Sequence, residues 1–430
     1  MPLVSELAWF WWQTNIRLPP QRNAEMLKRS GSIRVSRTTT SSKGLAAILA
    51  LSSAILGACA PPAPMPDGGP PDAPLMLPTL GLNDVSVLFP RPASLEDLGY
   101  LRPDDEGARG ILLPQEVFDT VPGFPVVPRD GIAYARMRVL SLRFDACGGN
   151  GEVCVPQIRL VMQPIATDGT PRDSALHLFY ALTDEELPML VRELRQLRLL
   201  APEVRDSPLD VHAALLAQGV EGAYGTALRE VVLRYAGEQN LVRVTFFLRA
   251  PPTTEVWFFG GLERDGEGIL RVMNIVGVGR GNQRVIRTLV ADGYQFDVTP
   301  NATMPEDGSA LLTSASAEAA DDATRRAALA SYLRLENPNT YVPDALPCAG
   351  CHLAGFITAE AERRFGLTGA QFPDDIFTSH FDLSVRGAAL TTPSSLRAFG
   401  WFGDEPMIVP RTIHESAHVV EDIERRFPAR

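Results

Sequence analysis

The five cysteines of this 430-residue chain constrain its fold and its compartment more than any other feature of the sequence. They are Cys59, the pair Cys147 and Cys154, and the pair Cys348 and Cys351. Each has a chemical assignment, argued below, and none is left over as an unexplained thiol. Because such use of cysteine is typical of oxidising compartments, we expect an exported protein.

The N-terminal segment 1–58 has the layout of a bacterial export signal. A basic and polar stretch at 26–42 precedes an apolar run at 44–56, which is too short to span a membrane but suits a signal peptide. The run leads into Leu-Gly-Ala-Cys59, which resembles the lipobox of bacterial lipoproteins. The resemblance implies that Cys59 is diacylated and becomes the mature N-terminus. The alternative is an ordinary signal peptide, or a membrane-anchored tail, with an incidental cysteine.

The residues on either side of this signal are expected to have no packed core. Residues 1–25 fit no signal-peptide layout, which makes Met26 a candidate initiator. Residues 59–80 are rich in proline and glycine and are expected to form an extended tether. Ala60 is not the aspartate that retains lipoproteins in the inner membrane. We therefore expect a lipid-anchored protein of the bacterial cell envelope, at the outer membrane and facing the periplasm or the surface.

The charge of the chain argues against nucleic acid as a partner. The formal net charge is -11, and the export segment contains seven basic residues against two acidic ones, so the remainder is more acidic still. A body of that charge repels phosphate backbones.

Residues 81–299 are expected to form an α+β domain rich in β-sheet. Alternating apolar and polar residues predict strands, at 137–144, 157–163, 241–249, 255–259 and 269–275. Helices are expected at 183–200, where Thr183 and Glu186 resemble a capping box, and at 211–218 and 224–235. The glycine-rich loop between Cys147 and Cys154 has no histidine nearby, which favours a disulfide over a metal site.

No catalytic signature is evident in this middle domain. The glycine cluster 277–281 follows a strand, but Asn282 stands where a dinucleotide fingerprint needs its third glycine, so we expect a turn rather than a phosphate-binding loop. His177 and His212 have no evident nucleophile nearby and are expected to be packed or capping residues.

The strongest motif is Cys348-Ala-Gly-Cys351-His352. Two thiols three residues apart can each add to one vinyl group of haem, and the adjacent histidine is then placed as the proximal iron ligand. The motif therefore predicts one covalently bound haem c. The alternatives are a redox-active or structural disulfide and half of a zinc site. Export favours haem, because c-type attachment takes place outside the cytoplasm.

The last segment, 341–430, resembles a monohaem class I c-type cytochrome. The motif lies near its start, Met407 comes late, and a helix is predicted over 411–427. The resemblance implies a small, mainly α-helical domain in which Met407 is the distal iron ligand and the last helix packs against the first. The connector 300–340 contains a predicted helix at 314–335, a candidate for that first helix.

Three histidines are rivals of Met407 as the distal ligand. His380, between two aromatic residues, is the more serious one. His414 and His418 share a helix face and could ligate a metal together, but acidic residues such as Glu415 indicate that much of this helix is solvated. A further set of aromatic residues is expected to line the haem pocket: Phe356, Phe399, Trp401 and Phe402.

These features together predict an exported, lipid-anchored cytochrome that passes single electrons to an exported redox protein. The alternative is a binding or structural lipoprotein of the cell envelope, in which the haem is a sensor or a stability element. A haem enzyme such as a peroxidase ranks last, because it needs a second haem or an open iron site, so we expect an electron carrier more than an enzyme.

Overall fold

The computed structural model describes residues 77–121, 134–148, 154–201, 208–249, 255–291, 293–300, 308–385 and 396–429. Cys59, the export signal and most of the proline-rich tether lie outside these residues. The helices longer than one turn are α3 (Gln115–Thr120), α4 (Glu186–Leu199), α5 (Ala213–Gln218), α6 (Ala223–Tyr235), α7 (Ser314–Ala319), α8 (Asp322–Glu336), α9 (Cys348–Phe365) and α10 (Pro410–Arg426), preceded by the single turn α2 (Leu82–Val85).

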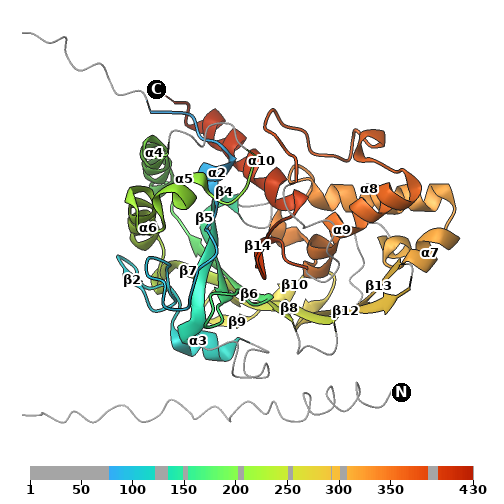
Figure 1. Ribbon diagram of the computed structural model, residues 1–430, viewed down its shortest axis with the longest axis horizontal. Helices are drawn as coiled ribbons and strands as arrows, with labels where there is room; N and C mark the ends of the chain where they lie inside the picture. The colour runs from blue at the N-terminus through green and yellow to red at the C-terminus, as the bar shows by residue number, and fades with distance from the viewer. Residues whose placement is uncertain are drawn as a thin grey trace, which may run out of the picture. The chain divides into compact units, whose positions relative to one another are not determined.

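Most strands belong to one antiparallel sheet of nine strands (Figure 1). Its order is β1 (Ser86–Leu88), β4 (Met137–Gly148), β5 (Val155–Pro164), β6 (Ser174–Ala181), β7 (Leu241–Arg249), β8 (Glu255–Arg264), β12 (Gln283–Val290) and β13 (Gly293–Thr299), with β9 (Leu270–Val272) beside β8. Three small hairpins complete the strands: β2 (Glu106–Gly107) with β3 (Gly110–Ile111), β10 (Asn274–Ile275) with β11 (Gly279–Arg280), and β14 (Phe399–Phe402) with β15 (Glu405–Ile408).

One face of the sheet, here called the α4 face, is apolar and covered by helices. Its strands contribute Leu160, Leu178 and Val244, which are buried in one hydrophobic cluster with Leu190 of α4 and Leu228 of α6. Side chains alternate between the two faces of a strand, so the residues next to these in sequence point to the opposite face of the sheet. Burial of this apolar surface is the main stabilising term for the first half of the chain.

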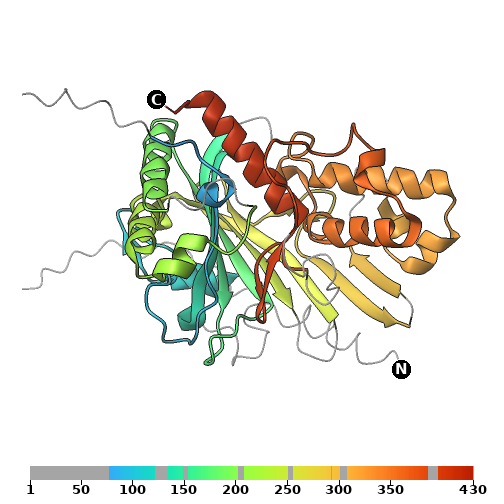
Figure 2. The ribbon, with the colours of Figure 1, turned by 45° about the horizontal axis from the view of Figure 1, so that its top comes forward.

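The opposite face, here called the α9 face, is covered by the C-terminal part of the chain (Figure 2). On β7 and β8, Phe247 and Phe259 share a second buried cluster with Leu353 and Ile357 of α9. Toward the other edge the α9 face is polar, and its buried groups are paired with the C-terminal segment. Gln163 of β5, for example, donates to the Trp401 carbonyl oxygen at 2.9 Å.

The segment 341–430 shares its hydrophobic core with the sheet. Ile413 and Val420 of α10 are buried in the same cluster as Leu142 of β4. Contacts within Pro70–Arg430 group these residues into a single unit. Helix α10 also contacts α8 and α9, so the last helix of the chain packs on the helix that carries the cysteine motif.

The α+β fold class predicted from the sequence is confirmed, and most predicted strands and helices lie within two or three residues of their expected bounds. The single strand expected at 269–275 is wrong, because β9 and β10 belong to different sheets. The continuous helix expected at 314–335 is also wrong: α7 ends at Ala319 and α8 begins at Asp322. Asp321 breaks it, because its side chain accepts a hydrogen bond from the Thr324 amide at 2.7 Å and caps α8.

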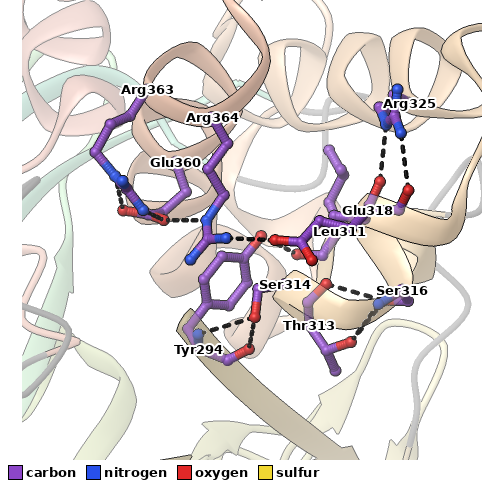
Figure 3. A network of polar contacts seen from close by, with 11 residues as sticks. Tyr294, Leu311, Thr313, Ser314, Ser316, Glu318, Arg325, Glu360, Arg363 and Arg364 are labelled. Carbon is purple, nitrogen blue, oxygen red and sulfur yellow. Dashed lines mark hydrogen bonds and ion pairs between the residues drawn. The ribbon is translucent and has the colours of Figure 1, made fainter. Parts of the chain in front are cut away.

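A polar network anchors α9 to α7 and β13 (Figure 3). Arg364 of α9 donates to Glu318 of α7 at 2.8 Å and to Glu360 of its own helix at 3.0 Å. Tyr294 of β13 donates its hydroxyl to the Leu311 carbonyl at 2.9 Å. These contacts hold the C-terminal half of α9 on the sheet and so position its first turn, which carries the motif.

Within the part of the chain that the structure describes, no helix combines the length and the apolar character needed to cross a membrane.

Candidate haem site

The cysteine motif forms the first turns of α9. Pro347 precedes the helix, and its carbonyl oxygen accepts the Cys351 amide at 3.3 Å. Residues three apart on a helix lie on the same side, so Cys348 and Cys351 present their thiols to the same region. The Ala349 amide donates to the side-chain oxygen of Gln283 on β12 at 2.8 Å, which fixes this turn against the sheet.

Both thiols of the motif are free and uncharged. Cys348 and Cys351 form no disulfide. Burial raises the pKa of Cys348 to about 12 and that of Cys351 to about 11, so neither is a thiolate at neutral pH. Reactive redox cysteines have a lowered pKa instead. Among the described residues, no group of three or more His, Cys, Asp and Glu side chains is arranged to hold a metal ion.

The orientation of His352 is fixed by a backbone carbonyl. Its Nδ1 atom lies 2.5 Å from the carbonyl oxygen of Leu396. A carbonyl only accepts hydrogen bonds, so Nδ1 carries the proton and the lone pair is on Nε2. Burial lowers the pKa of His352 to about 4, against the Leu396 hydrogen bond that raises it, so the ring is neutral at physiological pH. Histidine ligands of metals are oriented by this kind of hydrogen bond.

Two aromatic rings of the sheet contact the His352 imidazole. The ring of Phe247 is stacked on it, with centroids 5.4 Å apart and planes at 2°. The ring of Phe259 lies at 4.7 Å. The His352 ring therefore packs against an apolar part of the α9 face.

A buried cation lies beside this group. Arg397 is 2% exposed, and its guanidinium lies 4.4 Å from the centroid of the Phe247 ring. Burial lowers the pKa of Arg397 to about 10, while Asp173, at 3.7 Å, raises it. The group keeps its charge at neutral pH and makes the potential around His352 more positive.

The motif side chains are only partly accessible to solvent. Cys348, Cys351 and His352 each retain part of their accessible surface, yet burial is the main cause of the pKa shift of each. Two neutral thiols, an imidazole with a presented Nε2 and apolar walls together fit a covalently bound haem.

Met407 lies in β15 and is fully buried. It packs in a small cluster with Val409, Phe402 and Ala398. The cysteines of the motif pack against a different cluster, the one that contains Phe247 and Phe259. The role of Met407 as the distal iron ligand stays a prediction.

The rival histidines differ in their surroundings. The His380 side chain is 74% exposed, and its Nδ1 atom lies 3.5 Å from Glu421. His414 is oriented by the Glu336 carbonyl oxygen, 2.8 Å from its Nδ1 atom. His418 lies against the ring of Phe377, at 6.4 Å between centroids.

The expectation that the α10 surface around His414 is solvated is wrong at Glu415. This side chain is 7% exposed and pairs with Arg143 of β4 and with Arg411. Burial alone would raise the pKa of Glu415, but the two guanidinium groups outweigh it and lower the pKa. Helix α10 therefore meets the sheet through a buried charged group.

Of the aromatic residues expected near the haem, Phe356 contacts Tyr294 and Phe296 of β13, edge to face, at 5.2 and 5.4 Å. Trp401 donates its indole N–H to the Phe89 carbonyl at 2.9 Å. The rings that contact His352 are Phe247 and Phe259, which come from the middle of the chain. Sequence reasoning missed them, because only the strand pairing shows that they share a face with the motif.

Three predictions for the middle of the chain can also be placed. Cys147 and Cys154 are paired at disulfide-bonding distance, with their Cα atoms 4.6 Å apart. The glycine cluster begins in the turn between β10 and β11 and continues into β11, with φ of 72° at Gly277 in the turn and 89° at Gly279, the first residue of β11. His212 is fully buried and stacked on Tyr224 at 4.3 Å.

No protein-family model, curated protein or solved structure matches this chain.

Proposed function

We propose that this chain is an exported, lipid-anchored protein of the bacterial envelope that binds one haem covalently through Cys348 and Cys351. His352 is the proximal ligand of the iron, and the protein transfers single electrons to an exported redox partner. Haem bound in this way supplies a one-electron iron couple in an environment set by the protein.

The hydrogen bond from His352 to the Leu396 carbonyl supports this proposal most directly. This hydrogen bond selects the tautomer in which the lone pair is on Nε2. His352 follows Cys351 directly and lies on the same helix as Cys348. A ligand histidine needs one hydrogen-bond partner that orients its ring and leaves the other nitrogen for the metal, and His352 has such a partner.

The surrounding residues suit electron transfer. Phe247 and Phe259 exclude water from the His352 ring, and buried Arg397 favours the reduced, less positive state of a nearby iron. The polar contacts of α9 with Gln283 and of Arg364 with Glu318 hold the motif rigidly, which keeps reorganisation on electron transfer small.

The test is covalent haem content, measured by the pyridine haemochrome spectrum of the full chain expressed in a bacterium with c-type maturation. We expect a c-type spectrum and one haem per chain. Replacing Cys348 and Cys351 by alanine should abolish it. The matched control is the double replacement of Cys147 and Cys154, which should leave haem content unchanged. A wild-type chain without covalent haem would contradict the proposal.

A further inference from the structure

A histidine of the sheet lies on the same face as the aromatic rings under the motif. His177 of β6 is paired with Thr245 of β7. Thr245 and Phe247 are two residues apart on one strand, so their side chains point to the same face. Because Phe247 is stacked on His352, His177 lies on the sheet face that the motif helix α9 covers, one strand away from the ring that contacts His352.

The residues that flank His177 across the sheet are small. In the same row of paired residues stand Val161 of β5, Thr245 of β7 and Gly261 of β8. This face is filled by bulky rings one row away, at Phe247 and Phe259. His177 carries the only ring among these four paired residues, and the sulfur of Met273 lies close to Gly261.

The His177 imidazole has no hydrogen-bond partner among the described residues, although it faces the protein interior. The His177 side chain is half-buried. Its removal from water is the main cause that lowers its pKa to about 3, and the nearby His352, Arg397 and Arg159 lower the pKa further by smaller amounts. The two histidines are thus close enough to affect each other electrostatically.

We propose that His177 is the second axial ligand of the haem iron, so that the iron is bound by two histidines rather than by His352 and Met407. This rests on the covalent haem proposed above. The ligand comes from the middle of the sheet and the attachment motif from α9, so the cofactor joins the two halves of the chain. Two histidines give a lower potential than a histidine and a methionine.

The first test is the near-infrared magnetic circular dichroism of the ferric wild-type holoprotein, which separates bis-histidine from histidine–methionine ligation. We expect the bis-histidine signature. A histidine–methionine signature would overturn the proposal in favour of Met407 or Met273. This measurement needs no variant, so a folding defect cannot obscure it.

The second test is a set of variants read by the low-spin fraction and the midpoint potential. His177→Ala should keep its covalent haem, lose the wild-type low-spin spectrum and recover it with added imidazole. Met407→Leu, Met273→Leu and His380→Ala should keep the wild-type spectrum. A His177→Ala holoprotein with an unchanged spectrum would overturn the assignment and leave the covalent haem standing. A chain without covalent haem would instead contradict the proposed function.

Discussion

The imidazole of His352 donates from Nδ1 to the Leu396 carbonyl oxygen over 2.5 Å, across 44 residues of sequence. This contact joins the cysteine motif to the segment that leads into the β14–β15 hairpin. It also determines which ring nitrogen is available to a metal.

Replacing His352 by alanine should reduce covalent haem at least tenfold, because the thiols then lack the ligand that orients the iron beside them. Pyridine haemochrome content per chain measures this. The matched control is His414→Ala, since His414 also has its Nδ1 atom on a carbonyl, that of Glu336, but lies on α10. Equal haem content in the two variants would argue against His352 as a ligand.

Replacing Glu415 by glutamine should destabilise the protein by about 3 kcal/mol, because Arg143 and Arg411 would lose a buried partner. The folded-state pKa of Glu415 is depressed, so its contribution is present above the unfolded value of 4.5 and is lost as pH falls below it. Denaturant unfolding between pH 3 and pH 7 should show that the variant loses less unfolding free energy than the wild type as the pH falls. Glu405→Gln, on an exposed side chain, is the control.

Glu336 should have the opposite pH dependence. Burial raises its pKa from 4.5 to about 8, against a lowering by Arg411. A raised folded-state pKa stabilises the fold below pH 4.5, and this stabilisation is lost as pH rises through about 8. Glu336→Gln should therefore match the wild type near pH 4 and be more stable at pH 9, by an amount on the order of a few kcal/mol. Equal pH profiles for the two proteins would show that Glu336 ionises freely in the fold.

Removing the Cys147–Cys154 disulfide should cost about 2 kcal/mol of unfolding free energy, as expected for a short closed loop. Thiol titration of the denatured protein and urea unfolding measure the bond and its effect. The haem spectrum should not change, because neither cysteine belongs to the motif. A stability equal to that of the wild type would contradict a stabilising role of this bond.

Many strands and helices could be predicted from local patterns of apolar and polar residues. The strands at 137–144 and 241–249 were predictable, because their apolar residues largely alternate with polar ones and nearly all of them are buried. The break between α7 and α8 was missed although Asp321 is a typical N-cap, because the alanine-rich sequence on both sides favours helix.

The site was only half predictable, for a physical reason. Cys348, Cys351 and His352 lie within five consecutive residues, so their spacing alone predicts the haem attachment proposed here. The role proposed for His177 depends on the register of β6 with β7 and on the placement of α9, which are tertiary relationships. Glu415 was misjudged for the same reason, since Arg143 pairs with it from 272 residues away.

The most direct test of the central claim is to locate the haem on the chain. Trypsin should release residues 335–363 as one peptide, because arginines precede and end it at Arg334 and Arg363. We predict that this peptide alone keeps haem absorbance after denaturation and acid extraction, with the mass of one haem added. Haem that is extracted from the denatured chain, or found on another peptide, would contradict covalent attachment at Cys348 and Cys351.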